Sequence, residues 1–171
     1  MSARILDGEA FASRLHRETA ARVEKLKARG VTPGLVFIRV GEDSASRAYV
    51  SRKEKRAQEV GIASRTLVLP ESTPLASLLK EIDALNADSK VHGILIQSPL
   101  PASLPNDLVY AHVSPAKDVD GFHPVNFGKL LLGDASSFIP CTPAEILEIL
   151  RLGEIPTAGK HAFVVGRCQI S

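Results

Sequence analysis

The sequence predicts an α/β fold in which helices flank a parallel-stranded sheet. Two observations support this class. Helical and extended patterns alternate along the chain, as they do when successive strands pair in parallel through helical crossovers. The extended segments are short runs of Val, Ile, Leu and Phe between glycines or polar turns, which is typical of buried strands. In sheets of this kind, ligands bind beyond the carboxyl ends of the strands.

The first third of the chain supplies the first strand–helix–strand unit. Apolar residues at helical spacing predict a helix over residues 7–29, with Gly30 as its carboxyl-terminal stop. The run GLVFIRVG at 34–41 predicts a buried strand. Residues 44–60 then predict a helix, and ASRTLVL at 63–69 predicts a second strand.

The next elements are bounded by capping signals. Thr73 as N-cap and Pro74 in the first turn predict a helix to about residue 87. The run VHGILIQ at 91–97 predicts the third strand. The proline-rich, unpatterned stretch between residues 99 and 140 predicts a long irregular segment, which in a compact α/β domain is usually a binding loop.

The carboxyl-terminal part predicts one more helix and one more strand. TPAE at 142–145 has the pattern of a capping box and predicts a helix to about residue 150. KHAFVVG at 160–166 predicts a further strand, which would begin a Rossmann-like domain.

Composition excludes several classes of function. The net charge of +2 gives no basis for binding nucleic acid or an anionic membrane surface. No apolar run is long enough for a membrane helix, and the amino-terminal residues lack the pattern of a signal peptide. Two cysteines form no disulfide framework, so we expect reduced thiols in a cytoplasmic protein. No residue spacing indicates a metal site.

Tyr49 and Lys53 lie four residues apart on the predicted helix that follows the first strand. Residues at this spacing share one face of a helix, so both side chains can point into one cleft. A lysine serves as a base near neutral pH only where burial or nearby cations disfavour its ammonium form. The alternative is a basic amphipathic helix with a tyrosine at its edge. The same spacing marks short-chain dehydrogenases, but their glycine-rich nucleotide loop is missing here.

Three other positions have both a functional and a structural interpretation. Gln97 follows the third strand directly and can donate and accept hydrogen bonds, or it can simply bond the loop backbone. Asp118 and Asp120 precede Gly121, which indicates an acidic turn more readily than a metal site. Cys141 precedes a helix start, where a thiol pKa can be lowered, yet we expect a packed residue because no partner base is evident.

Taken together, five segments resemble the bifunctional methylenetetrahydrofolate dehydrogenase/cyclohydrolase family, often called the FolD family. They follow the family's order through almost the whole chain. The segments are VGEDSASRAYVSRKEKRAQEVGI, GILIQSPLP, KDVDGFHPVNFGKL, FIPCTPAEILEIL and VVGRC.

The resemblance implies a role for each candidate residue. Lys53 is similar to the lysine that lies over the one-carbon unit and transfers protons. Tyr49 is similar to the tyrosine that stacks on the aminobenzoyl ring of the folate. Gln97 resembles the glutamine that hydrogen-bonds that lysine, and Asp120 resembles the carboxylate that holds the pterin ring. The same resemblance places Pro99 and Leu100 at the substrate, and it places Gly166, Arg167 and Cys168 at the nucleotide.

The resemblance also implies the activity and the division of the chain. The full-length family oxidises 5,10-methylenetetrahydrofolate to the methenyl form with NADP and hydrolyses the product to 10-formyltetrahydrofolate, as a homodimer in one-carbon metabolism and purine biosynthesis. Residues 1–140 are expected to form the folate-binding catalytic domain, 141–159 a connecting helix and linker, and 160–171 the first strand of an NADP-binding domain. We expect these residues alone to lack NADP-dependent dehydrogenase activity. The alternative is a non-catalytic folate-binding or interaction fragment.

Two residues depart from the family pattern. Ser98 stands where the family usually has leucine, so a polar side chain occupies a turn expected to face the folate. Cys168 stands where a serine would be expected in the nucleotide-binding segment.

Overall fold

Three parallel strands form the centre of the computed structural model, which describes residues 5–165. Strand β1 (Gly34–Val40) lies between β2 (Ala63–Leu69) and β3 (Gly93–Ile96). Gly34 of β1 pairs with Ala63 of β2, and Leu35 pairs with Gly93 of β3. The predicted α/β class with a parallel sheet is therefore confirmed.

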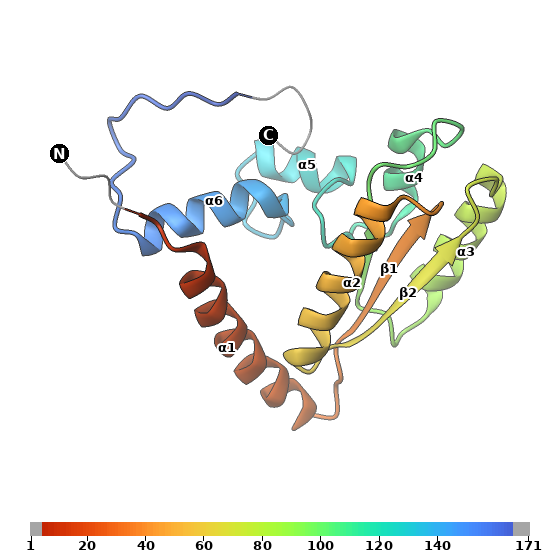
Figure 1. Cartoon of the computed structure of the whole chain (residues 1–171), viewed down its shortest axis with the longest axis horizontal. Coiled ribbons are helices and arrows are strands. Elements are labelled where there is room, and N and C mark those ends of the chain that lie inside the picture. The colour runs from red at the N-terminus through yellow and green to blue at the C-terminus, as the bar shows by residue number, and fades with distance from the viewer. Residues whose placement is uncertain (1–4, 166–171) are drawn as a thin grey trace.

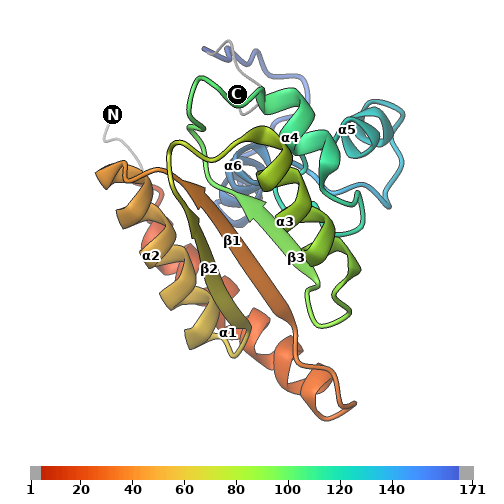
Figure 2. The same cartoon turned by 90° about the vertical axis from the view of Figure 1, so that its right-hand side faces the viewer.

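Helices cover both faces of this sheet. Helix α2 (Ser44–Glu59) lies on one face, and α3 (Leu75–Ala87) and α4 (Asn106–His112) lie on the other (Figures 1 and 2). The remaining helices lie beside these layers and are α1 (Gly8–Lys27), α5 (Pro124–Leu131) and α6 (Cys141–Leu152). In Figure 1, α1 and α6 meet at one end and face α2 across the molecule. Among the described residues, no helix is both long and apolar enough to cross a membrane.

The two faces of the sheet bury unequal amounts of apolar surface. The face toward α3 and α4 belongs to a core of thirteen buried residues, which includes Ile38, Leu78 and Ile82 at 0% exposure. The face toward α2 has only Phe37, Val50 and Leu95 as its buried cluster. Since successive side chains of a strand alternate between faces, Ile38 and Phe37 contribute to opposite sides. Helix α2 therefore has a small apolar contact with the sheet and a long polar surface.

The strand order brings three chain segments together at one edge. Because β1 and β3 are paired in parallel, the residues that follow their carboxyl ends lie side by side. A bridge between Ile94 and Asp118, also parallel, adds a third segment next to β3. The backbone N–H of Ile94 donates to Lys117 O at 2.7 Å in this bridge. The segments after β1, β3 and Lys117 are thus neighbours.

The predicted strand at 160–166 is wrong over its described part. Residues 160–165 have no strand conformation, and Phe163 and Val165 are exposed to 93% and 98%. A strand forms only when its backbone pairs with a neighbouring strand, and residues 5–165 provide no such neighbour for this segment. Gly166 lies outside the described residues.

Two predicted helix starts are also wrong in detail. Pro74, rather than Thr73, is the N-cap of α3, because the Thr73 hydroxyl donates to Pro70 O at 2.6 Å instead. Helix α6 begins at Cys141 with Pro140 as its N-cap and has no side-chain cap. The capping box predicted from TPAE is therefore absent, since Thr142 lies inside the first turn.

The stretch between residues 99 and 140 is less irregular than predicted. Residues 98–105 contain no helix or strand, as expected from their prolines. However, α4 and α5 follow within the same stretch. Each has only seven or eight residues, a length at which helical periodicity in the sequence is hard to recognise.

Candidate active site

Lys53 and Gln97 meet where α2 passes the carboxyl end of β3. Lys53 Nζ donates to Gln97 Oε1 at 3.2 Å. The Gln97 backbone N–H donates to Ile38 O at 2.9 Å, which extends the β1–β3 ladder by one residue. Its side-chain Nε2 donates to Ser98 O at 2.6 Å, so the amide oxygen is the atom left to face the lysine. The glutamine is therefore fixed at both its backbone and its side chain.

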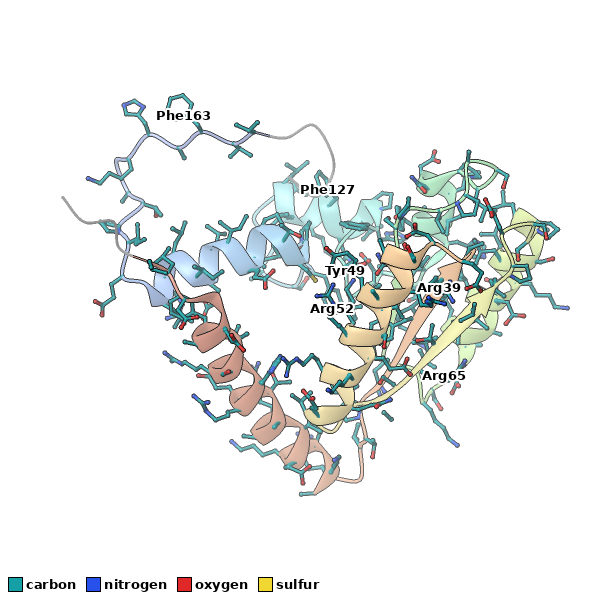
Figure 3. All side chains as sticks on the ribbon, in the orientation of Figure 1. Arg39, Tyr49, Arg52, Arg65, Phe127 and Phe163 are labelled. Carbon is teal, nitrogen blue, oxygen red and sulfur yellow. The ribbon has the colours of Figure 1, made fainter. Side chains whose placement is uncertain are left out.

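Tyr49 lies one helical turn before Lys53 on the same side of α2. The residue is 55% exposed, and the Arg52 guanidinium carbon lies 4.8 Å from the centroid of its ring. Figure 3 shows Tyr49 and Arg52 on the side of α2 that faces α6. The cation holds the ring by a cation–π contact, and the exposed ring surface can stack on a flat ligand.

The two aspartates of KDVDGF point to different surroundings. Asp118 is buried, and its carboxylate accepts from three donors: Phe122 N at 3.2 Å, His123 N at 2.9 Å and Asn126 Nδ2 at 2.9 Å. It thereby fixes the turn and the start of α5. The prediction of an acidic turn is confirmed for this residue.

Asp120 lines a cavity instead of stabilising the turn. Burial raises the pKa of its carboxyl group, the Lys53 charge opposes that rise, and the Asp118 charge adds to it. Its hydrogen-bond partner among the described residues is a weak one, the Cys141 thiol at 3.8 Å. Asp120 is therefore a half-buried carboxyl group whose capacity to accept hydrogen bonds is little used within the chain.

Gly121 explains how Cys141 comes so close to Asp120. The glycine has a φ of +73°, and a Cβ there would lie 2.8 Å from Pro140 N and 2.9 Å from Ile139 C. Only glycine permits both this conformation and this approach of the backbone. The segment before α6 thus packs directly on the acidic turn, and the first turn of α6 reaches the cavity.

The cavity between α2, the end of β3, the acidic turn and α6 has a volume of about 640 Å³. Its lining contains the predicted residues Tyr49, Lys53, Gln97, Pro99 and Asp120. The other lining residues are Asp43, Ala45, Ser46, Ile96, Ser98, Phe122, Cys141, Thr142 and Glu145. Leu100 lines a neighbouring hollow of about 420 Å³ instead. The predicted nucleotide residues Gly166, Arg167 and Cys168 lie outside the described residues.

The chain matches the family model for the catalytic domain of tetrahydrofolate dehydrogenase/cyclohydrolase over residues 6–120, which is more than half of its length. The chain belongs to this family. The bifunctional protein FolD 1 of Myxococcus xanthus is 51% identical over 168 residues, which cover 98% of this chain and 58% of that protein. FolD of Halalkalibacterium halodurans is 48% identical over 170 residues. The chain thus spans about three fifths of the length of the curated relatives it matches.

Solved structures of the family have the same fold. The bifunctional FolD enzyme of Campylobacter jejuni is 41% identical, with a TM-score of 0.88 over 90% of this chain and 55% of that one. FolD of Trypanosoma brucei, solved with NADP cofactor and an inhibitor, is 32% identical, with a TM-score of 0.89 over 94% and 55%.

The start of α6 contributes cavity residues that were not predicted as site residues. Thr142 and Glu145 line the cavity beside Cys141. The capping-box interpretation of TPAE concealed these two, because it assigned both to backbone caps. Thr142 and Glu145 lie three residues apart, a spacing that places them on neighbouring positions of one helix face.

Cys141 is not a reactive nucleophile in this setting. Burial raises the pKa of its thiol, and the neighbouring Asp120 charge raises it further. The raised pKa keeps the thiol protonated near neutral pH. The prediction that Cys141 is a packed residue is wrong, because the residue is exposed at the start of α6. The described residues also contain no group of three His, Cys, Asp or Glu side chains that could hold a metal ion.

The arrangement joins an amine and a carboxyl group across one cavity. Lys53 is the one lysine among the described residues that line the cavity, and it has an amide oxygen at hydrogen-bond distance. Asp120 provides a carboxylate, and Tyr49 provides an aromatic surface. In a member of this family, these groups can orient a flat heterocycle at one end and move a proton at its centre.

Proposed function

We propose that this cavity binds a reduced folate and that the whole protein oxidises 5,10-methylenetetrahydrofolate with NADP and hydrolyses the 5,10-methenyl product to 10-formyltetrahydrofolate. The observation that carries the proposal is the Lys53–Gln97 contact, which lies in the same cavity as Asp120 and Tyr49. A cavity of about 640 Å³ is within the usual range for small-molecule sites.

Asp120 orients the pterin end of the substrate. The amino-pyrimidinone edge of a pterin presents two donors, and a carboxylate can accept both. Burial raises the pKa of Asp120 in the free protein, so these donors restore hydrogen bonds that favour its ionised form. Tyr49 then stacks on the aminobenzoyl ring, one helical turn from the lysine.

Lys53 transfers protons at the one-carbon unit. In the hydrolysis, water adds to the cationic methenyl carbon and loses a proton, and the neutral amine of Lys53 accepts it. The substrate cation itself disfavours the ammonium form of a nearby lysine. Gln97 Oε1 holds the amine in position, which lowers the entropic cost of reaching the reactive geometry.

The dehydrogenase step requires NADP, which accepts the hydride when it is bound. Residues 5–165 contain one three-stranded sheet and no second sheet that could hold a dinucleotide. We assign nucleotide binding to Gly166, Arg167 and Cys168 together with the remaining length that the relatives possess. We propose that residues 1–140 form the folate-binding catalytic domain, 141–159 a connecting helix and linker, and 160–171 the beginning of the NADP-binding domain.

The lysine is the group to test. Lys53→Met in the whole protein should lower hydrolysis of methenyltetrahydrofolate, followed by its absorbance, by about 100-fold or more. Folate binding, measured by titration calorimetry, should change little, because Asp120 and Tyr49 remain. Lys55→Met is the matched control, since Lys55 is an exposed lysine of the same helix that does not line the cavity. A Lys53→Met protein that keeps more than about a tenth of the activity would show that Lys53 is not the base.

The assembly and location of the whole protein are part of the same proposal. We propose a homodimer that acts in the cytoplasm, as the family resemblance implies. Sedimentation equilibrium of the whole protein tests the dimer, and a monomer at micromolar concentration would contradict it.

A further inference from the structure

Tyr110 on α4 holds a serine of the candidate active site. Its side chain is buried, with 8% exposure, and belongs to the large core cluster. Its ring also packs edge to face on Phe122, with the centroids 5.2 Å apart. The Tyr110 hydroxyl forms a hydrogen bond with Ser98 Oγ. A buried phenol hydroxyl needs such a partner, because leaving it without one costs the full desolvation penalty.

This bond is the first of three consecutive contacts that end at the lysine. Ser98 O accepts from Gln97 Nε2 at 2.6 Å, and Gln97 Oε1 accepts from Lys53 Nζ at 3.2 Å. The same serine residue thus bonds α4 through its side chain and the glutamine through its backbone. Tyr110 is anchored in the core, whereas Lys53 is an exposed residue of α2.

The arrangement indicates what the side chain at position 98 does. Its hydroxyl hydrogen-bonds the Tyr110 hydroxyl, which an aliphatic side chain there could not do. Ser98 restricts the rotation of its own peptide group because its side chain is held by a core residue. A peptide carbonyl held in this way keeps Gln97 Nε2 occupied, which turns the amide oxygen toward Lys53.

We propose that the Ser98–Tyr110 hydroxyl pair is a positioning device for Lys53 that acts through the Gln97 amide. Neither hydroxyl reacts with the substrate. The pair limits the orientations of the glutamine and therefore keeps the lysine amine at one place in the cavity. The expected effect on turnover rests on the proposed function, whereas the expected effect on the reactivity of the Lys53 amine does not.

The first experiment measures Lys53 without any turnover. Wild-type protein, Ser98→Ala, Tyr110→Phe and the double variant are acylated with acetic anhydride at one fixed pH, and peptide mass spectrometry gives the rate at each lysine. Lys53 should react faster in all three variants and to the same extent, because the oxygen that binds its ammonium form is no longer fixed. Lys55 is the internal reference and should not change.

The second experiment measures hydrolysis of methenyltetrahydrofolate by the whole protein. Each single variant should lower kcat about fivefold, the factor that corresponds to one ordinary hydrogen bond. KM should remain nearly unchanged, since substrate contacts are kept. The double variant should be no slower than either single variant, because both substitutions remove the same contact. Ser98→Thr, which keeps the hydroxyl, should restore most of kcat.

A matched control separates this role from general loss of stability. Ser137 also donates its hydroxyl within the fold, to Asn126 O at 3.0 Å, but it lies outside the cavity lining. Ser137→Ala should leave kcat and Lys53 acylation unchanged. Thermal unfolding of every variant sets an assay temperature at which all are folded.

Three results would overturn the inference. The first is that Tyr110→Phe keeps the wild-type kcat while Ser98→Ala is slow. The second is that the variants change KM instead of kcat. The third is that Lys53 is acylated at the wild-type rate in the variants. If the wild-type protein does not hydrolyse the folate but the acylation rates change as expected, the proposed function fails and the positioning role stands.

Discussion

The acidic turn contains two aspartates with opposite environments, only two residues apart. Asp118 is buried and accepts three hydrogen bonds from the turn and from α5. Asp120 lines the cavity, and its partner among the described residues is a distant thiol. Both belong to the same acidic motif in the sequence. Asp118 nevertheless stabilises the turn and the start of α5, whereas Asp120 faces the cavity between α2 and α6.

Hydrogen-bond partners distinguish a structural carboxylate from one that is available to bind a ligand. A buried charge that is fully hydrogen-bonded stabilises the folded chain, and its removal leaves donors without partners. A half-buried charge with few partners destabilises the chain, and such a group in a cavity is a candidate for a functional site. By this criterion Asp118 stabilises the fold, whereas Asp120 is the carboxylate for which we propose a role in binding.

The largest effect should follow from removing the structural carboxylate. Asp118→Ala leaves Phe122 N, His123 N and Asn126 Nδ2 without their acceptor, and it should lower the free energy of unfolding by about 3 kcal/mol or more. Urea unfolding at neutral pH measures this. Asp120→Ala is the control and should unfold at the same urea concentration as the wild type or a higher one. Equal destabilisation by both substitutions would remove the distinction between them.

The next effect concerns binding by Asp120. Asp120→Ala should weaken the binding of a reduced folate by roughly 1.5–3 kcal/mol, which is the value of a hydrogen bond to a charged group. Titration calorimetry measures the loss in protein that is shown to be folded. Asp118→Ala should weaken binding less wherever it remains folded, because its carboxylate points into the turn. A larger loss of affinity in Asp118→Ala would show that Asp120 is not the aspartate that contacts the pterin.

A smaller effect is a pH dependence of stability. Burial raises the pKa of Asp120 in the folded protein, so its favourable contribution is present below the ordinary carboxyl pKa and is lost as the pH rises through the raised value. Asp120→Asn should therefore be more stable than the wild type at neutral pH, and this advantage should disappear in acid. Urea unfolding at several pH values measures both curves. If the two stability curves ran parallel with pH, burial would not raise the pKa of Asp120 in the folded protein.

The smallest effect is on a neighbouring thiol. Burial and the Asp120 charge raise the pKa of Cys141, so iodoacetamide should alkylate it slowly near neutral pH. Asp120→Asn removes the charge and should increase the rate severalfold. Peptide mass spectrometry separates Cys141 from Cys168. An unchanged rate in Asp120→Asn would show that the two groups do not interact.

Much of the fold could be predicted from the sequence, because helices and strands depend on local patterns. The bounds of β2 were predicted to the residue, and those of β1 and α2 to within one. Continuous apolar runs and glycine stops are strong signals, since burial of a strand requires them. Tyr49, Lys53, Gln97 and Asp120 were chosen by family resemblance, and the structure brings all four to one cavity.

Other features were decided only by the tertiary structure. The sequence could not show that Asp118 points into the turn and Asp120 into the cavity, because this depends on the parallel bridge to Ile94 and on the packing around Gly121. It concealed Thr142 and Glu145 as cavity residues, and it gave no sign that Tyr110 holds Ser98. The strand expected at 160–166 failed for the same reason, since strand pairing needs a neighbour. Local patterns specify elements, whereas hydrogen bonds between distant segments exist only after the elements have packed.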